Sequence, residues 1–264
     1  MDDVRPRPPR LPRRLGQALR HSLAILGILL LAGCRSVDSV ESSDLTSRVR
    51  AIETSAAAHA LPGWSVLDTN ALNSLAAALR RQPHPCSAPA LQTTLFPRLT
   101  PSDSIHSPGE ALRTGRGSCL AFTCLVVLLR ERCHCDPTDA FVLPGHVTPG
   151  WNGIYFETLR QGTLRDSAFY RSHFSLSTRP WYRNSHGHTD SILIGILWHD
   201  LGLALAQQEN CRSASEAFDQ ALKHIPDHPP TLLALSRCEQ DPAKRLQLEA
   251  KALLADPVIS KTSD

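Results

Sequence analysis

Beyond its first 33 residues the chain has no excess of positive charge. Those residues contain six of the 28 lysines and arginines but only two of the 25 aspartates and glutamates, which leaves 22 basic and 23 acidic residues in the remainder. The formal charge of +3 and the pI of about 8.5 are therefore properties of the N-terminal segment. A protein that binds nucleic acid needs a basic surface to meet the phosphates. We therefore expect no nucleic-acid partner.

The cysteines and acidic residues lack the spacings that metal sites require. No pair of cysteines has the CxxC spacing that structural zinc prefers. Cys133 and Cys135 flank His134 too closely to supply three ligands to one ion, although residues 119–135 are rich in such side chains: Cys119, Cys124, Cys133, His134 and Cys135. No acidic loop has the spacing of a calcium site. We expect neither a metal ion nor another cofactor.

The apolar segment of residues 22–33 is too short to cross a bilayer as a stable helix. It follows an arginine-rich stretch, which is typical of a secretory signal peptide. It ends in Leu31-Ala32-Gly33-Cys34, which resembles the lipobox of bacterial lipoproteins. The resemblance implies that residues 1–33 are removed and that the Cys34 thiol carries lipid chains, which hold the protein on a membrane. The alternative is an uncleaved anchor, which the charged residues directly after Cys34 disfavour.

The residue after the lipidated cysteine decides the membrane to which such lipoproteins are sorted. Here it is Arg35 rather than aspartate, so the resemblance implies the outer membrane of a Gram-negative cell envelope, with the protein facing the periplasm. Residues 34–46 are polar and rich in serine and aspartate, a composition typical of a tether. We therefore expect the folded part to begin near residue 47.

The chain as a whole has the composition of a globular protein, with 42% hydrophobic and 20% charged residues. The spacing of apolar residues predicts helices over about 46–60 and 68–81. Prolines then predict an irregular region at 83–113, where they stand at Pro83, Pro85, Pro97, Pro101 and Pro108. A loop of that length inside a compact domain is usually functional. We expect it, together with residues 160–190, to shape a substrate cleft.

The most informative segment begins at residue 114, where two glycines and a serine lead into an unbroken apolar run. This pattern predicts a tight turn at Gly117, an N-cap at Ser118 and a buried helix that begins at Cys119. The free N–H groups and the dipole at a helix N-terminus favour an anion, so a thiol there ionises more readily than a free cysteine. The N–H groups can also hold the oxyanion that forms when a thiolate attacks an amide carbonyl. Cys119 is therefore the candidate nucleophile, with Gly117 and Ser118 in its turn and oxyanion site.

His146 is the candidate base, because a histidine from elsewhere in the fold must pair with such a thiol and protonate the leaving amine. Residues 150–153 lie between two strand-like runs and predict a hairpin. A four-residue loop places His146 directly opposite Glu157, whereas a two-residue turn at Asn152-Gly153 leaves the two on a diagonal of the same face. Only an odd-numbered loop separates them. Glu157 is therefore the candidate residue that orients His146.

Together these residues resemble bacterial transglutaminase-like proteins with C-terminal tetratricopeptide repeats. The resemblance covers roughly residues 105–257 and rests on Gly117-Ser118-Cys119-Leu-Ala, Leu143-Pro-Gly-His146 and Phe156-Glu157-Thr158, followed by Gly162 and Tyr170. It implies a papain-like α+β fold, with the cysteine on a central helix against an antiparallel sheet and the histidine and an acidic residue on adjacent strands. It also implies amide chemistry on a protein or peptide substrate. The usual third residue of the family is an aspartate further along, so Glu157 is a departure.

Two other interpretations of the cysteines stay open. One is that Cys119 is an inert core residue, as we expect for Cys124 on the same apolar helix; the helix start, the glycines and the available histidine favour the nucleophile. The other concerns disulfides, which are common in exported proteins. With Cys34 lipidated and Cys119 free, six cysteines allow 15 complete pairings, and the sequence selects none among Cys86, Cys124, Cys133, Cys135, Cys211 and Cys238.

The C-terminal region has the spacing of a tetratricopeptide repeat. Its markers are Trp198, Leu201, Gly202, Ala214, Phe218, Ala221 and Pro226, with Leu205 in place of the usual tyrosine. The small residues let two antiparallel helices approach closely, while Trp198 and Phe218 fill the space between them. A second unit is degenerate and lacks about three residues near Asp241-Pro242. Fewer than three repeats rarely stand alone, so we expect these helices to dock on the catalytic domain or on a partner.

The sequence therefore predicts four parts: a signal peptide (1–33), a tether (34–46), a transglutaminase-like domain (47–190) and tetratricopeptide-like helices (191–259). The function that follows is that of a membrane-tethered cysteine hydrolase or acyl transferase. The alternative is a catalytically inactive, lipid-anchored scaffold that binds a protein partner through its C-terminal helices.

Replacing Cys34 by serine tests the lipid anchor. Without the thiol the chain has no site for the lipid, so we expect the wild type to incorporate labelled palmitate in cells and Cys34→Ser to incorporate none. Cys119→Ser is the matched control, and it should keep the label. Equal labelling of the wild type and Cys34→Ser would contradict the lipoprotein interpretation.

Overall fold

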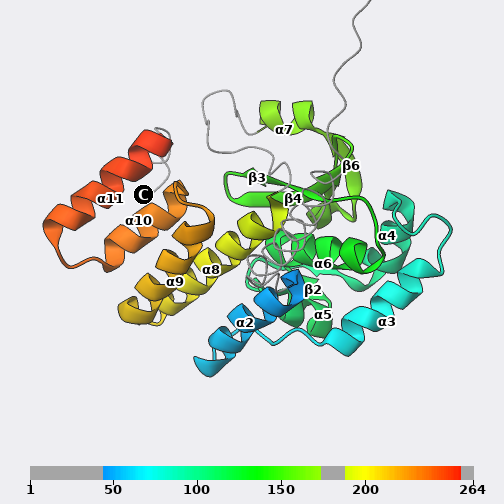
Figure 1. The fold of residues 1–264 in the computed structure, drawn as a ribbon, viewed down its shortest axis with the longest axis horizontal. Helices are drawn as coiled ribbons and strands as arrows, with labels where there is room; N and C mark the ends of the chain where they lie inside the picture. The colour runs from blue at the N-terminus through cyan, green and yellow to red at the C-terminus, as the bar shows by residue number, and fades with distance from the viewer. Residues whose placement is uncertain (1–43, 174–187, 257–264) are drawn as a thin grey trace, which may run out of the picture. The chain divides into compact units, whose positions relative to one another are not determined.

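The structure, a computed structural model, describes residues 44–173 and 188–256. The predicted leader, Cys34 and nearly all of the tether lie outside the described residues. In chain order the elements, labelled in Figure 1 where there is room, are α2 (Leu45–Ala58), α3 (Thr69–Arg80), α4 (Ala88–Thr94), η1 (Phe96–Arg98), β1 (Thr100–Pro101), α5 (Pro108–Thr114), β2 (Arg116–Gly117), α6 (Cys119–Arg132), β3 (Asp139–Leu143), β4 (His146–Trp151), β5 (Ile154–Glu157), η2 (Thr158–Arg160), β6 (Thr163–Asp166), α7 (Ser167–His173), α8 (Thr189–Gln207), α9 (Cys211–His224), α10 (Pro229–Cys238) and α11 (Pro242–Ala255).

The helices predicted over 46–60 and 68–81 are confirmed as α2 and α3. Each begins after an aspartate that caps it: Asp44 accepts a hydrogen bond from Ser47 N and Asp68 accepts one from Asn70 N, both at 2.8 Å. These side chains satisfy backbone N–H groups that have no partner inside the helix.

The prediction of an irregular region over 83–113 is wrong in part, because the segment contains α4 and α5. Ser87 and Ser107 cap these two helices, and Pro89 and Pro108 stand within their first two positions. A proline there loses no hydrogen bond and already has a helical φ. The prolines therefore start helices in places where the sequence suggested a loop.

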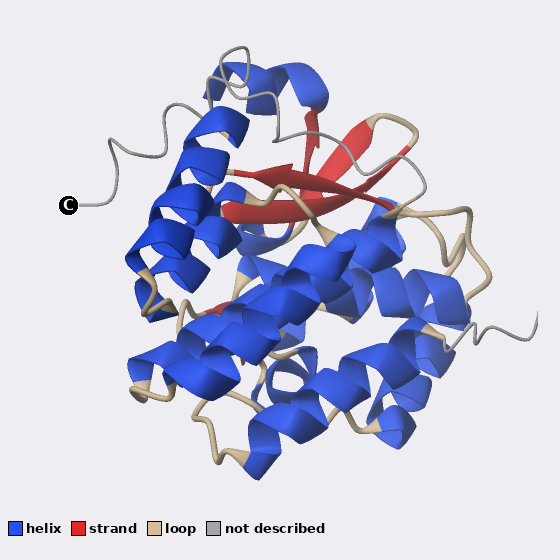
Figure 2. Ribbon diagram, turned by 60° about the vertical axis from the view of Figure 1, so that its left-hand side comes forward, coloured by secondary structure: helices blue, strands red, loops and turns tan. Residues whose placement is uncertain are grey.

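The larger sheet is antiparallel, with the strand order β3-β4-β5-β6. Asn152 and Gly153 join β4 to β5 with φ values of 53° and 75°, which a two-residue type I′ turn requires. In the resulting register Trp151 pairs with Ile154. The two-residue hairpin is therefore confirmed, and the four-residue loop is wrong. Figure 2 shows the long strands of this sheet together on one side of the large helices.

The α6 helix is the centre of the fold. Its residues from Leu120 to Arg130 are all buried, so every side of the helix needs cover. The sheet supplies part of it, and Thr123 Oγ1 donates to Val147 O of β4 at 3.1 Å. Helices α3, α5 and α8 also pack against α6. The chain thus mixes many helices with a small antiparallel sheet, as the predicted fold class requires at its coarsest level.

The two faces of the sheet belong to different apolar clusters. Ala140, Val142, Val147 and Phe156 join the main core around α6, whereas Phe141, Leu143 and Tyr155 form a second cluster with Tyr170 of α7. This division follows from the alternation of side chains along a strand. Because of it, α7 covers the face of the sheet that does not contact α6.

The C-terminal helices α8 and α9 form the expected close hairpin. A β carbon at Gly202 would lie 2.4 Å from Phe218 Cε1, so the glycine is needed for the two helices to approach. The expected docking is also observed, because α8 packs on α2, α6 and β3. By length and composition α8 could cross a membrane, but half of its apolar window is buried in the fold, as in a core helix. The chain from Asp44 on groups as one compact unit.

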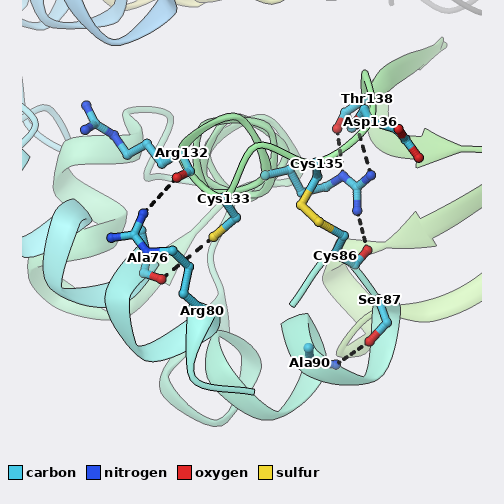
Figure 3. Close-up of a disulfide and its surroundings, with 11 residues drawn as sticks. Ala76, Arg80, Cys86, Ser87, Ala90, Arg132, Cys133, Cys135, Asp136 and Thr138 are labelled. Carbon is cyan, nitrogen blue, oxygen red and sulfur yellow. Dashed lines mark hydrogen bonds between the residues drawn. A yellow bond between two sulfur atoms is a disulfide. The ribbon is translucent and has the colours of Figure 1, made fainter. Parts of the chain in front are cut away.

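A disulfide between Cys86 and Cys135 ties the segment before α4 to the end of α6 (Figure 3). Beside it the buried Arg130 guanidinium donates to Cys86 O, to Asp136 O and, at 2.8 Å, to Thr138 Oγ1. The same guanidinium lies 3.8 Å from the centroid of the Trp151 ring. Disulfide and arginine together fasten α6 to its surroundings at the end opposite to Cys119.

Removing this disulfide should destabilise the fold measurably. Because the bridge spans 49 residues, we expect Cys86→Ser combined with Cys135→Ser to lower the free energy of unfolding by about 2–4 kcal/mol in urea denaturation. Cys211→Ser, which removes an exposed thiol, is the control and should leave the urea midpoint unchanged. A double variant as stable as the wild type would mean that the crosslink constrains little of the unfolded chain.

Candidate active site

Cys119 stands at the first position of α6, as predicted, and is partly exposed. The Ser118 side chain caps the helix by accepting from Ala121 N at 3.3 Å. Gly117 allows a close approach, since a β carbon there would lie 2.6 Å from the Phe122 ring. Gly117 and Ser118 thus set the turn that presents the thiol.

The backbone N–H of Ser118 is not available to an oxyanion, because it donates to Ile105 O at 2.8 Å. The N–H groups of Cys119 and Leu120 have no partner among the residues that the structure describes. They belong to the first turn of α6, where unpaired donors and the helix dipole favour negative charge. An oxyanion next to the Cys119 sulfur would therefore find its donors in these two groups.

His146 and Glu157 meet across the β4–β5 hairpin. His146 Nε2 lies 3.0 Å from Glu157 Oε2, which is the diagonal contact predicted for a two-residue turn. The Tyr170 hydroxyl donates to the same carboxylate oxygen at 3.0 Å, and Leu159 N donates to Oε1 at 3.2 Å. The buried carboxylate is thus held by a strand partner, a tyrosine from α7 and a backbone N–H.

The Cys119 side chain interacts with His146 and raises its pKa, so His146 connects the other two predicted residues. Burial lowers the pKa of His146, but the bonds to Cys119 and Glu157 outweigh it and raise the pKa to about 9. Burial likewise raises the pKa of Glu157, and the hydrogen bond and charge of His146 bring it below its usual value. Burial and the neighbouring Glu157 charge raise the pKa of Tyr170, which keeps its proton as a donor. His146 is therefore an imidazolium at neutral pH.

Cys119 and His146 open onto a cavity of about 390 Å³. Part of its lining comes from the segment around Cys119 and from β3 and β4. Another part comes from the C-terminal region, with His199 and Asp200 of α8 and with His228, the N-cap of α10. The helical region is therefore part of the site.

Two groups of side chains in this site were not assigned a role by sequence reasoning. Tyr170 contributed to the family resemblance, but its bond to Glu157 depends on α7 folding over the sheet. The residues of α8 and α10 stand more than 70 positions from Cys119 in the chain, and they carried only the helical spacing of a repeat. In the described part of the chain, no three histidine, cysteine, aspartate or glutamate residues are grouped to hold a metal ion.

The chain matches no family model, no curated protein and no solved structure with which it was compared.

Replacing Glu157 by glutamine should lower the pKa of His146. The amide keeps the shape of the side chain but removes the negative charge, so we expect the pKa to fall from about 9 by at least about one. The imidazolium then loses its proton at a lower pH, which an NMR titration of the ring detects. Tyr170→Phe keeps the charge and should change the pKa of His146 less. A His146 that still titrates near 9 in Glu157→Gln would show that the carboxylate does not stabilise the imidazolium.

Proposed function

We propose that this chain is a membrane-tethered, transglutaminase-like cysteine hydrolase or acyl transferase that acts on an amide bond of a protein or peptide. The observation that carries the proposal is the connection from Cys119 through His146 to Glu157, with Cys119 and His146 in the lining of a cavity. A nucleophile, a base and a group that orients the base are the minimum for covalent amide chemistry.

The first step forms a thioester. The Cys119 thiolate attacks the amide carbonyl carbon, and the new oxyanion accepts hydrogen bonds from the N–H groups of Cys119 and Leu120. When the intermediate collapses, the carbon–nitrogen bond breaks and the leaving amine takes the proton of the His146 imidazolium. Glu157 and Tyr170 hold the ring in place through this transfer.

The second step releases the acyl group. Neutral His146 takes a proton from water or from an acceptor amine, and the resulting nucleophile attacks the thioester carbonyl. The carbon–sulfur bond then breaks and Cys119 leaves as a thiolate beside the imidazolium. Water as the nucleophile gives hydrolysis, and an amine gives acyl transfer.

The finer fold assignment belongs to the same proposal. A central helix with a cysteine at its start, packed on an antiparallel sheet that carries the histidine and the acid, fits a papain-like core. The glycine-dependent hairpin of α8 and α9 fits a tetratricopeptide unit. A lipid on Cys34 would place both at the outer membrane of a Gram-negative envelope, where the disulfide would be stable.

A second candidate function is that of a lipid-anchored scaffold, and α11 favours it. Leu246, Leu253 and Leu254 on this helix are exposed by 66%, 39% and 85%. Leu246 and Leu253 are seven residues apart, so they lie on one side of the helix. Such a stripe fits an apolar face of a partner protein, and this function needs no reaction at Cys119.

An amide-mimicking probe that alkylates thiols separates the two functions. We expect the wild type to be labelled at Cys119 and Cys119→Ala to lose that label, whereas Cys211→Ser, which removes an exposed thiol, should keep it. Equal labelling of the wild type and Cys119→Ala would reject the enzyme. If in cells Cys119→Ala behaves as the wild type while Leu246→Ser with Leu253→Ser loses a phenotype, the scaffold is favoured.

A further inference from the structure

Two hollows meet at a hydrogen-bonded pair that joins the segment before α5 to α8. His106 Nδ1 lies 2.9 Å from Asp200 Oδ2. The pair lines both the cavity beside Cys119 and a neighbouring hollow of about 680 Å³, and Asp103 lines both as well. The pair thus lies between the cavity beside Cys119 and the neighbouring hollow.

The walls of these two hollows are rich in negative charge. Neither is lined by a lysine or an arginine, whereas Asp103, Glu110 and Asp200 all contribute carboxylates. Glu110 is paired with Arg113, which does not line the hollows, so its charge is largely balanced from behind. The hydrogen bond to Asp200 raises the pKa of His106, and the protonated ring balances Asp200. The His146 imidazolium also lines the cavity beside Cys119, and Glu157 balances it. Asp103 is left without a cationic partner in these walls. Charges of one sign in a cleft attract ligands of the other.

A buried histidine beside Asp200 adds an unused hydrogen-bonding atom. His199 is 7% exposed and lines the cavity beside Cys119. Its Nδ1 bonds the Thr231 hydroxyl at 3.0 Å, and that hydroxyl also bonds His228 Nδ1 at 2.6 Å. No residue in the described part of the chain bonds the other ring nitrogen of His199. This nitrogen is therefore available to hydrogen-bond a molecule in the cavity.

The rest of the cavity is apolar, with Leu143, Ile196 and Leu203 among its walls. A methylene chain would bury its surface there while its charged end reaches the carboxylates, as lysine and arginine side chains do elsewhere. We propose that this cavity selects substrates with a cationic group on an aliphatic stem near the scissile amide, held by Asp103 and Asp200. The proposal rests on the proposed function and adds a substrate class to it.

Two thiol reagents of opposite charge test the cavity itself. The reagents are 2-(trimethylammonio)ethyl and 2-sulfonatoethyl methanethiosulfonate, and mass spectrometry of the peptide that contains Cys119 gives both rates in the full-length chain. The rate of the cationic reagent is divided by that of the anionic reagent, and this ratio is then divided by the same ratio for a free small-molecule thiol. The second division removes the difference in intrinsic reactivity between the two reagents. We expect the cationic reagent to be favoured by about tenfold or more. We expect Asp103→Asn with Asp200→Asn to bring the ratio close to that of the free thiol.

Asp219→Asn, an exposed aspartate on α9, is the matched control and should keep the wild-type ratio. A wild-type ratio equal to that of the free thiol, or a ratio unchanged in the double variant, would overturn the proposal. A Cys119 that neither reagent reaches would overturn it too, because the cavity would then be closed to ligands.

Peptidyl acyloxymethyl ketones extend the test to the substrate. One probe carries lysine beside the reactive carbonyl, and the other carries its neutral isostere norleucine. We expect the lysine probe to inactivate the wild type about tenfold faster than the norleucine probe. The two probes should inactivate the double variant at the same rate. Equal rates for both probes in the wild type overturn the proposed specificity. If no ketone reacts while the methanethiosulfonate ratio holds, the hydrolase proposal fails and the cation preference of the cavity stands.

Discussion

A helix that is apolar on every side must be enclosed on every side, and α6 imposes this constraint on the rest of the chain. Its residues from Leu120 to Arg130 are all buried, so no face of this part of the helix contacts solvent. The sheet, α3, α5 and α8 pack around it and remove its apolar surface from water. At the helix N-terminus this enclosure ends, and Cys119 is partly exposed there. The candidate nucleophile therefore lies where the packing around the N-terminal end of α6 stops.

The same enclosure decides how charge is handled in the site. A carboxylate as buried as Glu157 is costly unless it is paired and fully hydrogen-bonded. His146, Tyr170 and Leu159 N provide three donors, and the histidine also provides the positive charge. The carboxylate in turn keeps His146 protonated beside the thiol. Removing any one of these partners leaves a buried polar atom without its hydrogen bond, so the Glu157 carboxylate and its three donors act together.

Local signals along the chain predicted the elements that depend on neighbours in sequence. The glycines and serine before Cys119 predicted the start of α6, and the Asn152-Gly153 pair allowed the hairpin that sets His146 beside Glu157. The prolines misled, because a proline at the first turn of a helix and a proline in a loop have the same φ. Only the packing of α4 and α5 on the core distinguishes the two. The disulfide was beyond prediction for a related reason, since pairing depends on which thiols the fold brings together.

The sequence alone determined a thiol at a helix start, a histidine and an acid on one hairpin face, and a close pair of C-terminal helices. These features follow from capping, from the alternation of side chains along strands and from the spacing of small residues. Tertiary structure alone decided that α8 closes the cavity opposite Cys119 and brings Asp200 to His106. It did so because α6 needs cover on that side, and the repeat spacing around residue 200 does not show which surface α8 will cover.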